Sequence, residues 1–284
     1  MGVSREAVIE ALAKVGAHPC DGDYRVRFEQ SGTPGENFGP ERAEVARVNP
    51  LVSCLMVTRG DAELMAFSVD CYARQTWANR ELIVVTEPEA VPAVEAMLAA
   101  SGAPNCFIAP IAGKQALGDL RNAAIARARG DIVMQWDDDD LQDPLRIALS
   151  VSVLLQSGAA AVAMARWLIW WPARRVAAIS YRRHWEGTLA VWRAHAPVYP
   201  AYPRHEDAVA VRHLLETRRT AVFDAPLLYV YAVTGQNTWD ADHFADLVAE
   251  AEQRFEGEAY DALNLVLAER LPVLDFDAFL RRRA

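Results

Sequence analysis

The chain has 284 residues, of which 52% are hydrophobic and 24% are charged, a composition typical of a folded globular protein with a full core. Its formal net charge of -9 argues against a nucleic-acid-binding protein, because such proteins present a basic face to phosphates. The four cysteines lie far apart and form no CxxC pair, so we expect a reducing compartment, the cytoplasm. The most apolar region is interrupted by polar residues, so the sequence predicts no transmembrane segment.

The first 49 residues have the pattern of an N-terminal extension. Ser4 is a candidate N-cap for a short amphipathic helix that ends near Val15. Glycine, proline and polar residues dominate residues 16–50. We therefore expect a linker there rather than part of the core sheet.

Strand and helix patterns alternate after this extension. Apolar runs predict strands at residues 51–58, 81–86, 106–109 and 130–136. The segments between them predict helices at residues 61–74, 90–100 and 118–129. This alternation is typical of βαβ units, so it predicts an α/β fold with a mostly parallel sheet and helices on both faces. Ligands of such sheets bind at the carboxyl ends of the strands, where Thr58 and Glu87 would meet the end of the fourth strand.

The fourth predicted strand runs directly into four consecutive carboxylates, Asp137 to Asp140. Four adjacent negative charges repel one another and destabilise the fold unless a cation lies among them. A set of oxygen ligands suits a hard divalent ion such as Mg²⁺ or Mn²⁺, which keeps room for water and substrate phosphates. A solvated acidic turn or a helix N-terminus accounts for one or two such residues more easily than for four. The sequence therefore predicts a metal site at this strand end.

Several motifs occur in the order and spacing seen in one enzyme family. They are the opening strand at residues 50–58, Gln75-Thr76-Trp77, the pair Arg121-Asn122, the D-x-D-D run at residues 137–140 with Pro144 beyond it, and the pair Glu206-Asp207. Together they resemble family-2 glycosyltransferases of the GT-A fold. The resemblance implies a Rossmann-type GT-A domain at residues 50–239, preceded by the extension at residues 1–49. Residues 240–284 would form a C-terminal helical segment packed on that domain, with helices predicted at residues 242–255, 258–270 and 275–283.

The activity that this resemblance implies is an inverting, metal-dependent glycosyl transfer of hexosyltransferase type. The donor would be a nucleotide-diphosphate sugar, with UDP as the expected nucleotide, and the acceptor a hydroxyl of a saccharide or another molecule. Asp139 and Asp137 would hold Mn²⁺ or Mg²⁺ against the charge that develops on the leaving diphosphate. The residues expected to bind the donor are Thr58, Arg59, Glu87, Arg121, Asp137 and Asp138.

An acceptor hydroxyl needs a base, and Asp207 is the candidate, with Glu206 shaping the site. Two acids at the start of the helix predicted at residues 208–216 would also be favoured by the helix dipole alone, without any catalytic role. Thr234 stands where the family pattern has a histidine. His243 is therefore the candidate replacement, as a metal ligand or a phosphate contact, although a lone histidine is more often structural.

Two other functions would use the same residues. A nucleotidyltransferase would direct the same sheet and carboxylates at the α-phosphate of a nucleotide. A nucleotide-sugar-binding protein would keep the fold without turnover, which the departures at Thr86 and Thr234 make credible. Five tryptophans after the metal motif could stack on sugars, but we expect them in the core: Trp167, Trp170, Trp171, Trp185 and Trp192.

Overall fold

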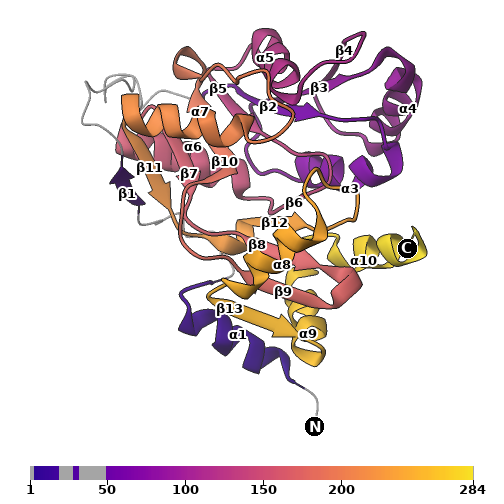
Figure 1. The fold of residues 1–284 in the computed structure, drawn as a ribbon, viewed down its shortest axis with the longest axis vertical. Helices are drawn as coiled ribbons and strands as arrows, with labels where there is room; N and C mark the ends of the chain where they lie inside the picture. Colours follow the sequence, from indigo (N-terminus) through magenta and orange to yellow (C-terminus); the bar gives the residue numbers. More distant parts are fainter. Residues whose placement is uncertain (1–2, 19–27, 32–48, 284) are drawn as a thin grey trace.

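A computed structural model describes residues 3–18, 28–31 and 49–283 (Figure 1). The predicted linker lies mostly outside the described residues. Its described part includes β1 (Phe28–Ser31), which pairs antiparallel with β11 (Thr220–Phe223) at the edge of the main sheet. The prediction that residues 16–50 lie apart from the core sheet was therefore wrong for this segment, whose pairing partner is about 190 residues away.

The helix predicted to begin after Ser4 is confirmed as α1 (Arg5–Lys14). The Ser4 hydroxyl accepts a hydrogen bond from the amide of Ala7 at 3.2 Å, which satisfies one free donor of the first turn. Val8 and Leu12 are buried, and α1 packs against α9 (Glu258–Leu267). The N-terminal helix therefore belongs to the folded body of the protein.

The main sheet has eight strands in the order β1-β11-β7-β10-β5-β2-β3-β4. Four predicted strands form its parallel half, and they are β2 (Val52–Val57), β3 (Arg80–Thr86), β4 (Cys106–Pro110) and β5 (Ile132–Gln135). The connecting helices are α3 (Ala62–Ala73), α4 (Val91–Ser101) and α5 (Leu117–Arg127). Beyond β5, strand β10 (Trp185–Trp192) runs antiparallel to β5 and to β7 (Ala161–Met164). The sheet is therefore mixed, with its parallel part where the sequence predicts it.

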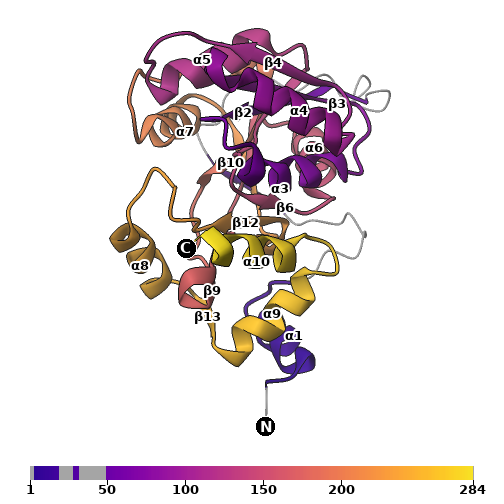
Figure 2. The ribbon, with the colours of Figure 1, turned by 90° about the vertical axis from the view of Figure 1, so that its right-hand side faces the viewer.

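Helices cover both faces of the main sheet, as predicted. Figure 2 shows α5 and α7 (Glu206–Thr217) on one face and α3, α4 and α6 (Arg146–Ser157) on the other. Short 3₁₀ helices are η1 (Pro88–Ala90), η2 (Pro172–Arg174), η3 (Arg193–His195) and η4 (Pro226–Leu228). Among the described residues, no helix combines the length and the apolar character that crossing a membrane requires.

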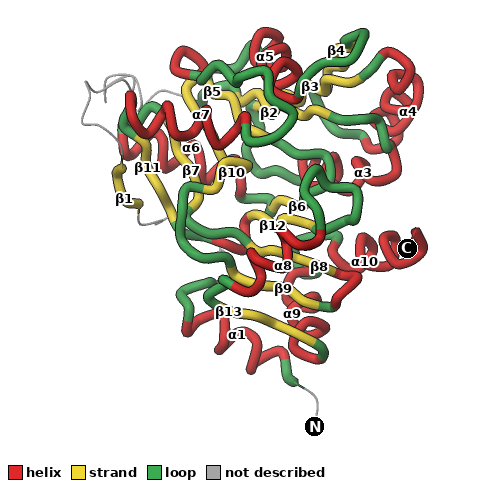
Figure 3. The backbone as a smooth tube through the Cα atoms, in the orientation of Figure 1, coloured by secondary structure: helices red, strands yellow, loops and turns green. Residues whose placement is uncertain are grey.

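The sequence did not predict a second, five-stranded sheet, which lies beside the first (Figure 3). Its order is β13-β9-β8-β12-β6, with β13 (Gln253–Glu256), β9 (Val176–Ile179), β8 (Leu168–Trp171), β12 (Tyr229–Ala232) and β6 (Leu141–Gln142). The helix expected at residues 242–255 is shorter, α8 (Ala241–Ala249), because β13 follows and pairs with β9. The C-terminal segment is thus not purely helical.

The last two helices, α9 and α10 (Val273–Arg283), pack on this second sheet. Trp170 of β8 stacks on Tyr260 and Phe276, and its indole N–H donates to the Asn264 side chain at 2.9 Å. All five tryptophans expected in the core are buried, which confirms the prediction for Trp170, Trp171 and Trp192, whereas Trp167 and Trp185 also line the cavity described below. The C-terminal helices therefore complete one hydrophobic core with the sheet.

The loop that leads into α7 rests on Gly118, near the start of α5. A Cβ atom at Gly118 would lie 1.8 Å from the carbonyl oxygen of Pro200. The amide of Gly118 also donates to the carbonyl of Tyr202 at 3.4 Å. Only glycine allows this close approach, and the approach sets where α7 begins.

We expect Gly118→Ala to destabilise the protein by about 1–3 kcal/mol, because an added methyl group must push this loop away from α5. Urea denaturation would measure the change in the free energy of unfolding. An unchanged denaturation midpoint would contradict the close packing of α5 against the loop.

Candidate active site

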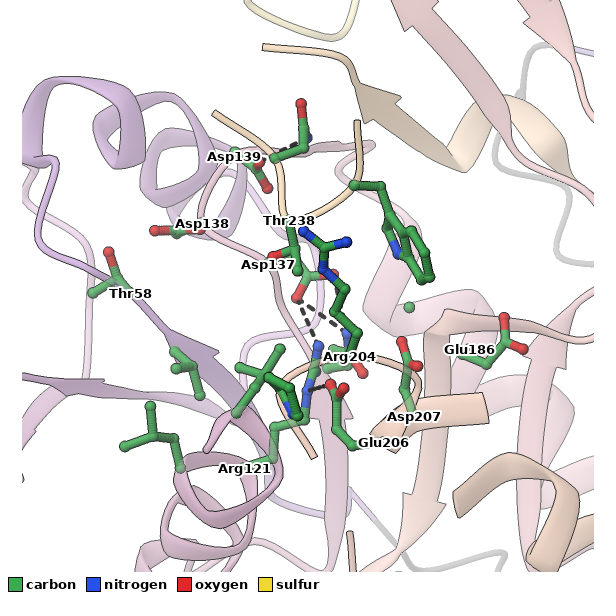
Figure 4. A pocket seen from close by; sticks show the side chains of 18 of the residues that line it. Thr58, Arg121, Asp137, Asp138, Asp139, Glu186, Arg204, Glu206, Asp207 and Thr238 are labelled. Carbon is green, nitrogen blue, oxygen red and sulfur yellow. Dashed lines mark hydrogen bonds and ion pairs between the residues drawn. The ribbon is translucent and has the colours of Figure 1, made fainter. Parts of the chain in front are cut away.

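A cavity of about 650 Å³ opens at the carboxyl ends of β2, β3 and β5. Its walls come from the turns after these strands, the start of α7 and the segment after β12 (Figure 4). Every residue that the sequence singles out for a site role lines it: Thr58, Arg59, Glu87, Arg121, Asp137, Asp138, Asp139, Glu206, Asp207 and His243. The fold therefore brings together residues that are up to 185 positions apart, although their chemical roles stay predictions.

Asp137 and Asp140 are braced by Tyr229, which comes from the second sheet. The Tyr229 hydroxyl lies 2.6 Å from Asp140 Oδ2 and 3.1 Å from Asp137 Oδ2. The amide of Ala232 donates to Asp140 Oδ1 at 2.8 Å. Asp140 is fully buried, so its carboxylate supports the turn and does not face the cavity.

Asp139 is held by Asn237, in the turn after β12. The Asn237 side-chain amide donates to Asp139 Oδ2 at 2.9 Å and to the carbonyl of Ala232 at 2.8 Å. Its oxygen accepts from the amide of Thr234 at 2.8 Å, so the Asn237 side chain is fixed from both ends. One carboxylate oxygen of Asp139 thus has a protein donor, while the side chain still lines the cavity.

Burial, and then the charge of neighbouring aspartates, raises the pKa values of Asp138, Asp139 and Asp140. Burial raises the pKa of Asp138 to about 6; the Thr58 hydroxyl opposes this shift and the charge of Asp137 adds to it. Burial also raises the pKa of Asp139 well above its ordinary value, and the charges of Asp138 and Asp137 raise it further. A cation beside these groups would remove the cost of ionising them.

Arg121 links the two acidic parts of the site. Its Nε atom donates to Glu206 Oε1 at 2.8 Å, and a terminal nitrogen lies 3.8 Å from Asp137 Oδ1. Burial alone would lower the pKa of the Arg121 guanidinium, but the carboxylates of Asp137, Asp207 and Glu206 hold it above its ordinary value. Arg121 therefore neutralises part of the acidic cluster and joins β5 to α7.

Asp207 and Glu206 form the first turn of α7 and differ in their surroundings. Glu206 is buried against Arg121, whereas Asp207 is half-buried and its Oδ1 accepts a hydrogen bond from the adjacent amide of Ala208 at 2.7 Å. His205 precedes them with a φ of 64°, a left-handed conformation that is uncommon outside glycine. This turn directs Asp207 toward the cavity (Figure 4).

The strand ends contribute the opposite wall. The Thr58 side chain is buried, and its hydroxyl oxygen accepts a hydrogen bond from the amide of Gly60 at 2.9 Å. Arg59 and Glu87 are exposed at the cavity edge. A Cβ atom at Gly60 would lie 2.3 Å from that of Ala90, so glycine is required in this turn. This wall is therefore tightly packed, with the charged side chains of Arg59 and Glu87 at its edge.

His243 lies in the first turn of α8, on the cavity wall. Its ring stacks on Trp239, with centroids 4.4 Å apart, and contacts Phe244 edge to face. Within the described ranges, no three His, Cys, Asp or Glu side chains converge so as to enclose a metal ion. The role of His243 as a metal ligand thus stays a prediction.

Sequence reasoning did not assign a role to several residues that shape the site. No sequence pattern indicates a site role for Tyr229, because it lies 89 positions from Asp140, on a strand of the sheet that was not predicted. Gln135 also went unassigned, although its side-chain amide donates to both Asp137 oxygens at 3.1 Å. Asn237 lies three residues after Thr234, and only the fold reveals its contact with Asp139.

Comparison with known proteins agrees with this geometry. Residues 53–182 match the family model described as Glycosyl transferase family 2. This segment is therefore similar to family-2 glycosyltransferases. No curated protein sequence matches the chain.

Solved structures with a similar fold include two glycosyltransferases. S. aureus TarS 1-349 in complex with UDP has a TM-score of 0.53 and 16% identity, over 77% of this chain and 70% of that one. The mannosyltransferase PcManGT from Pyrobaculum calidifontis, in complex with GDP-Man and Mn²⁺, has a TM-score of 0.50 and 15% identity, over 84% and 80% of the chains. The match covers 60% of the TarS 1-349 chain in another crystal structure. At these identities the likeness shows the GT-A fold alone.

The raised pKa of Asp138 predicts how the stability of the metal-free protein responds to pH. Between pH 3.8, the ordinary pKa of an aspartate, and a pH of about 6, the Asp138 carboxyl group is protonated in the folded protein and ionised in the unfolded chain. The folded state then binds more protons, so the free energy of unfolding falls as the pH rises through that window.

We expect Asp138→Asn to make this fall shallower, because the variant has no proton to lose. Urea denaturation of both proteins in chelator, at several pH values across the window, would measure it. Parallel curves for the two proteins would contradict the shift.

Proposed function

We propose that this protein is a glycosyltransferase that moves a hexosyl group from a nucleotide-diphosphate sugar to an acceptor hydroxyl, with inversion at the anomeric carbon. One observation carries the proposal: the carboxylates of Asp137, Asp138 and Asp139 and the carboxylate of Asp207 line one cavity. The first group suits the donor diphosphate, and the second suits the acceptor. The similarity of residues 53–182 to family-2 glycosyltransferases supports the same class of reaction.

The donor end would use a divalent ion held by Asp139, with Asp137 beside it. Carboxylate oxygens are the ligands that Mg²⁺ and Mn²⁺ prefer, and two of them leave positions for phosphate oxygens and water. Such an ion, when bound, stabilises the negative charge of the leaving diphosphate. The raised pKa of Asp139 fits this role, because a cation would relieve the repulsion that causes it.

The nucleotide would lie along the ends of β2 and β3, where Thr58, Arg59 and Glu87 line the cavity. TarS has been crystallised in complex with UDP and with UDP-GlcNAc, and PcManGT in complex with GDP-Man. These complexes support a nucleotide-sugar donor here. UDP is the expected nucleotide, and a sugar of hexose type is expected with it.

The chemical step would be a single displacement. The acceptor oxygen forms a bond to the anomeric carbon from the side opposite the diphosphate, and the bond from that carbon to the diphosphate oxygen breaks. The electron pair of the broken bond leaves with the nucleoside diphosphate, and the hydroxyl proton passes to Asp207. One displacement inverts the configuration of the anomeric carbon.

Arg121 and Glu206 would position this step. Their hydrogen bond at 2.8 Å ties the start of α7 to α5, and Arg121 also approaches Asp137. The distance between the base and the donor would depend on this link. The proposal therefore gives Glu206 a positioning role and not that of the base.

The first test concerns the metal. We expect Asp139→Asn to weaken nucleoside diphosphate binding in Mn²⁺ by about tenfold, because one charged ligand is lost, while binding in chelator changes little. Calorimetry with UDP and GDP, with Mn²⁺ and with chelator, would measure both affinities. Glu250→Gln, at an exposed site outside the cavity, is the matched control. Equal nucleotide affinity of the wild type with and without metal would refute the metal role.

The second test concerns the base. Asp207→Asn keeps the shape of the side chain but cannot accept the proton, so kcat should fall by about a hundredfold or more. Donor affinity should change little. Release of nucleoside diphosphate in the presence of acceptor would measure turnover, whereas release of pyrophosphate would identify a nucleotidyltransferase. A near-normal kcat in the variant would show that another group takes the proton.

A further inference from the structure

Three basic side chains surround the Trp239 ring on one wall of the cavity. The guanidinium carbon of Arg204 lies 5.4 Å from the ring centroid, and the rings of His205 and His243 lie 4.7 and 4.4 Å from it. All four residues line the cavity, and Trp239 is half-buried. The indole therefore holds three potential donors of hydrogen bonds at one place.

Arg204 in this group packs against an aromatic ring rather than an acid. Within the described part of the chain, no carboxylate lies within ion-pair distance of its guanidinium, which lies over the Trp239 ring. A second arginine, Arg183, lies on the same cavity, stacked over Trp185 at 4.5 Å and paired with Glu186. Arg204 is exposed at the cavity wall, so its guanidinium can reach a ligand there, and a guanidinium suits phosphate and carboxylate groups.

The surroundings of His243 agree with an anion site. Burial is the main cause that lowers the pKa of His243, the carboxylates of Asp240 and Asp246 oppose it, and the charges of Arg183 and His205 lower it further. The imidazole is thus close enough to Arg183 and His205 for their charges to change its pKa. Carboxylates and basic groups therefore both lie near His243, and a neutral imidazole there can donate its N–H to a negatively charged group.

We infer that Arg204, His205 and His243, arranged around Trp239, form a binding site for a phosphate or carboxylate group on the acceptor. The acceptor class is therefore a sugar or related hydroxyl compound that carries a negative charge. This inference rests on the proposed glycosyl transfer, because it assigns the anion to the second substrate of that reaction.

The position of the group favours the acceptor over the donor. Arg204 and His205 directly precede the turn that carries Asp207, the proposed base. Figure 4 shows Asp207 and Thr58 on opposite sides of Asp137. Since the nucleotide is proposed to lie along the strand that ends at Thr58, the wall next to Asp207 is open to the acceptor.

The experiment compares the binding of matched neutral and charged sugars to protein saturated with its tightest nucleoside diphosphate and Mn²⁺. The probes are glucose, glucose 6-phosphate and glucuronate, measured by calorimetry. We expect at least one charged probe to bind about tenfold or more tightly than glucose, as one charge-assisted hydrogen bond would allow. Arg204→Met should remove most of that preference, and Arg204→Lys should restore part of it.

Arg212→Met, which removes an exposed arginine of α7 outside the cavity, controls for the change in total charge and should keep the preference. His243→Ala should weaken the charged probe to the same degree in Mn²⁺ and in chelator, because no metal contact is lost.

Three results would overturn the inference. The first is equal affinity of the wild type for the charged and neutral probes. The second is a loss of nucleoside diphosphate affinity in Arg204→Met as large as the loss for the charged sugar, which would assign the group to the donor diphosphate. The third is a loss in His243→Ala that appears only with Mn²⁺. Binding is read without turnover, so a failure of the proposed transfer reaction would show separately, as no nucleoside diphosphate released with any acceptor.

Discussion

Repulsion among the carboxylates that follow β5 is the constraint on which the rest of the site depends. Four aspartates in sequence cannot stay close together in a partly buried turn unless donors or cations lie between them. The protein supplies those donors from distant segments: the Tyr229 hydroxyl, the Ala232 amide and the Asn237 side chain. Asp140 is buried and accepts two of these hydrogen bonds, whereas the side chains of Asp137 to Asp139 line the cavity.

These braces also explain why the second sheet is part of the site. Tyr229 and Ala232 are the ends of β12, and β12 pairs with β6, the short strand that directly follows the aspartates. A hydrogen bond between β12 and the acidic turn therefore fixes the two sheets to each other. The turn that contains Asn237 continues to Trp239 and α8. The hydrogen bond from Asn237 to Asp139 therefore fixes both the acidic turn and the segment that carries Trp239.

A second junction sets the position of α7. Gly118 allows the preceding loop to lie directly on α5, and the buried Glu206 then reaches Arg121. His205 accepts a left-handed conformation at this point, and such strain persists only where the surrounding contacts hold it. The strain coincides with the turn that carries Asp207, which is consistent with a site whose geometry matters more than its local backbone energy.

Local patterns in the sequence were enough to predict the parallel half of the main sheet, because buried parallel strands and their helices have strong periodicity, and Asp61 is a favoured N-cap residue for the first of these helices. The residues at those strand ends, from Thr58 to Asp139, were predictable for the same reason: parallel strands bring their carboxyl ends to one edge. The second sheet, the edge strand β1 and the brace from Tyr229 were decided only by tertiary structure. Their strands are two to four residues long, and apart from the neighbours β8 and β9 they pair with segments far away in the chain, so local patterns do not record the partner. The basic group around Trp239 has the same origin, since Arg204 and His243 lie 39 positions apart and meet only because α7 and α8 fold onto one cavity.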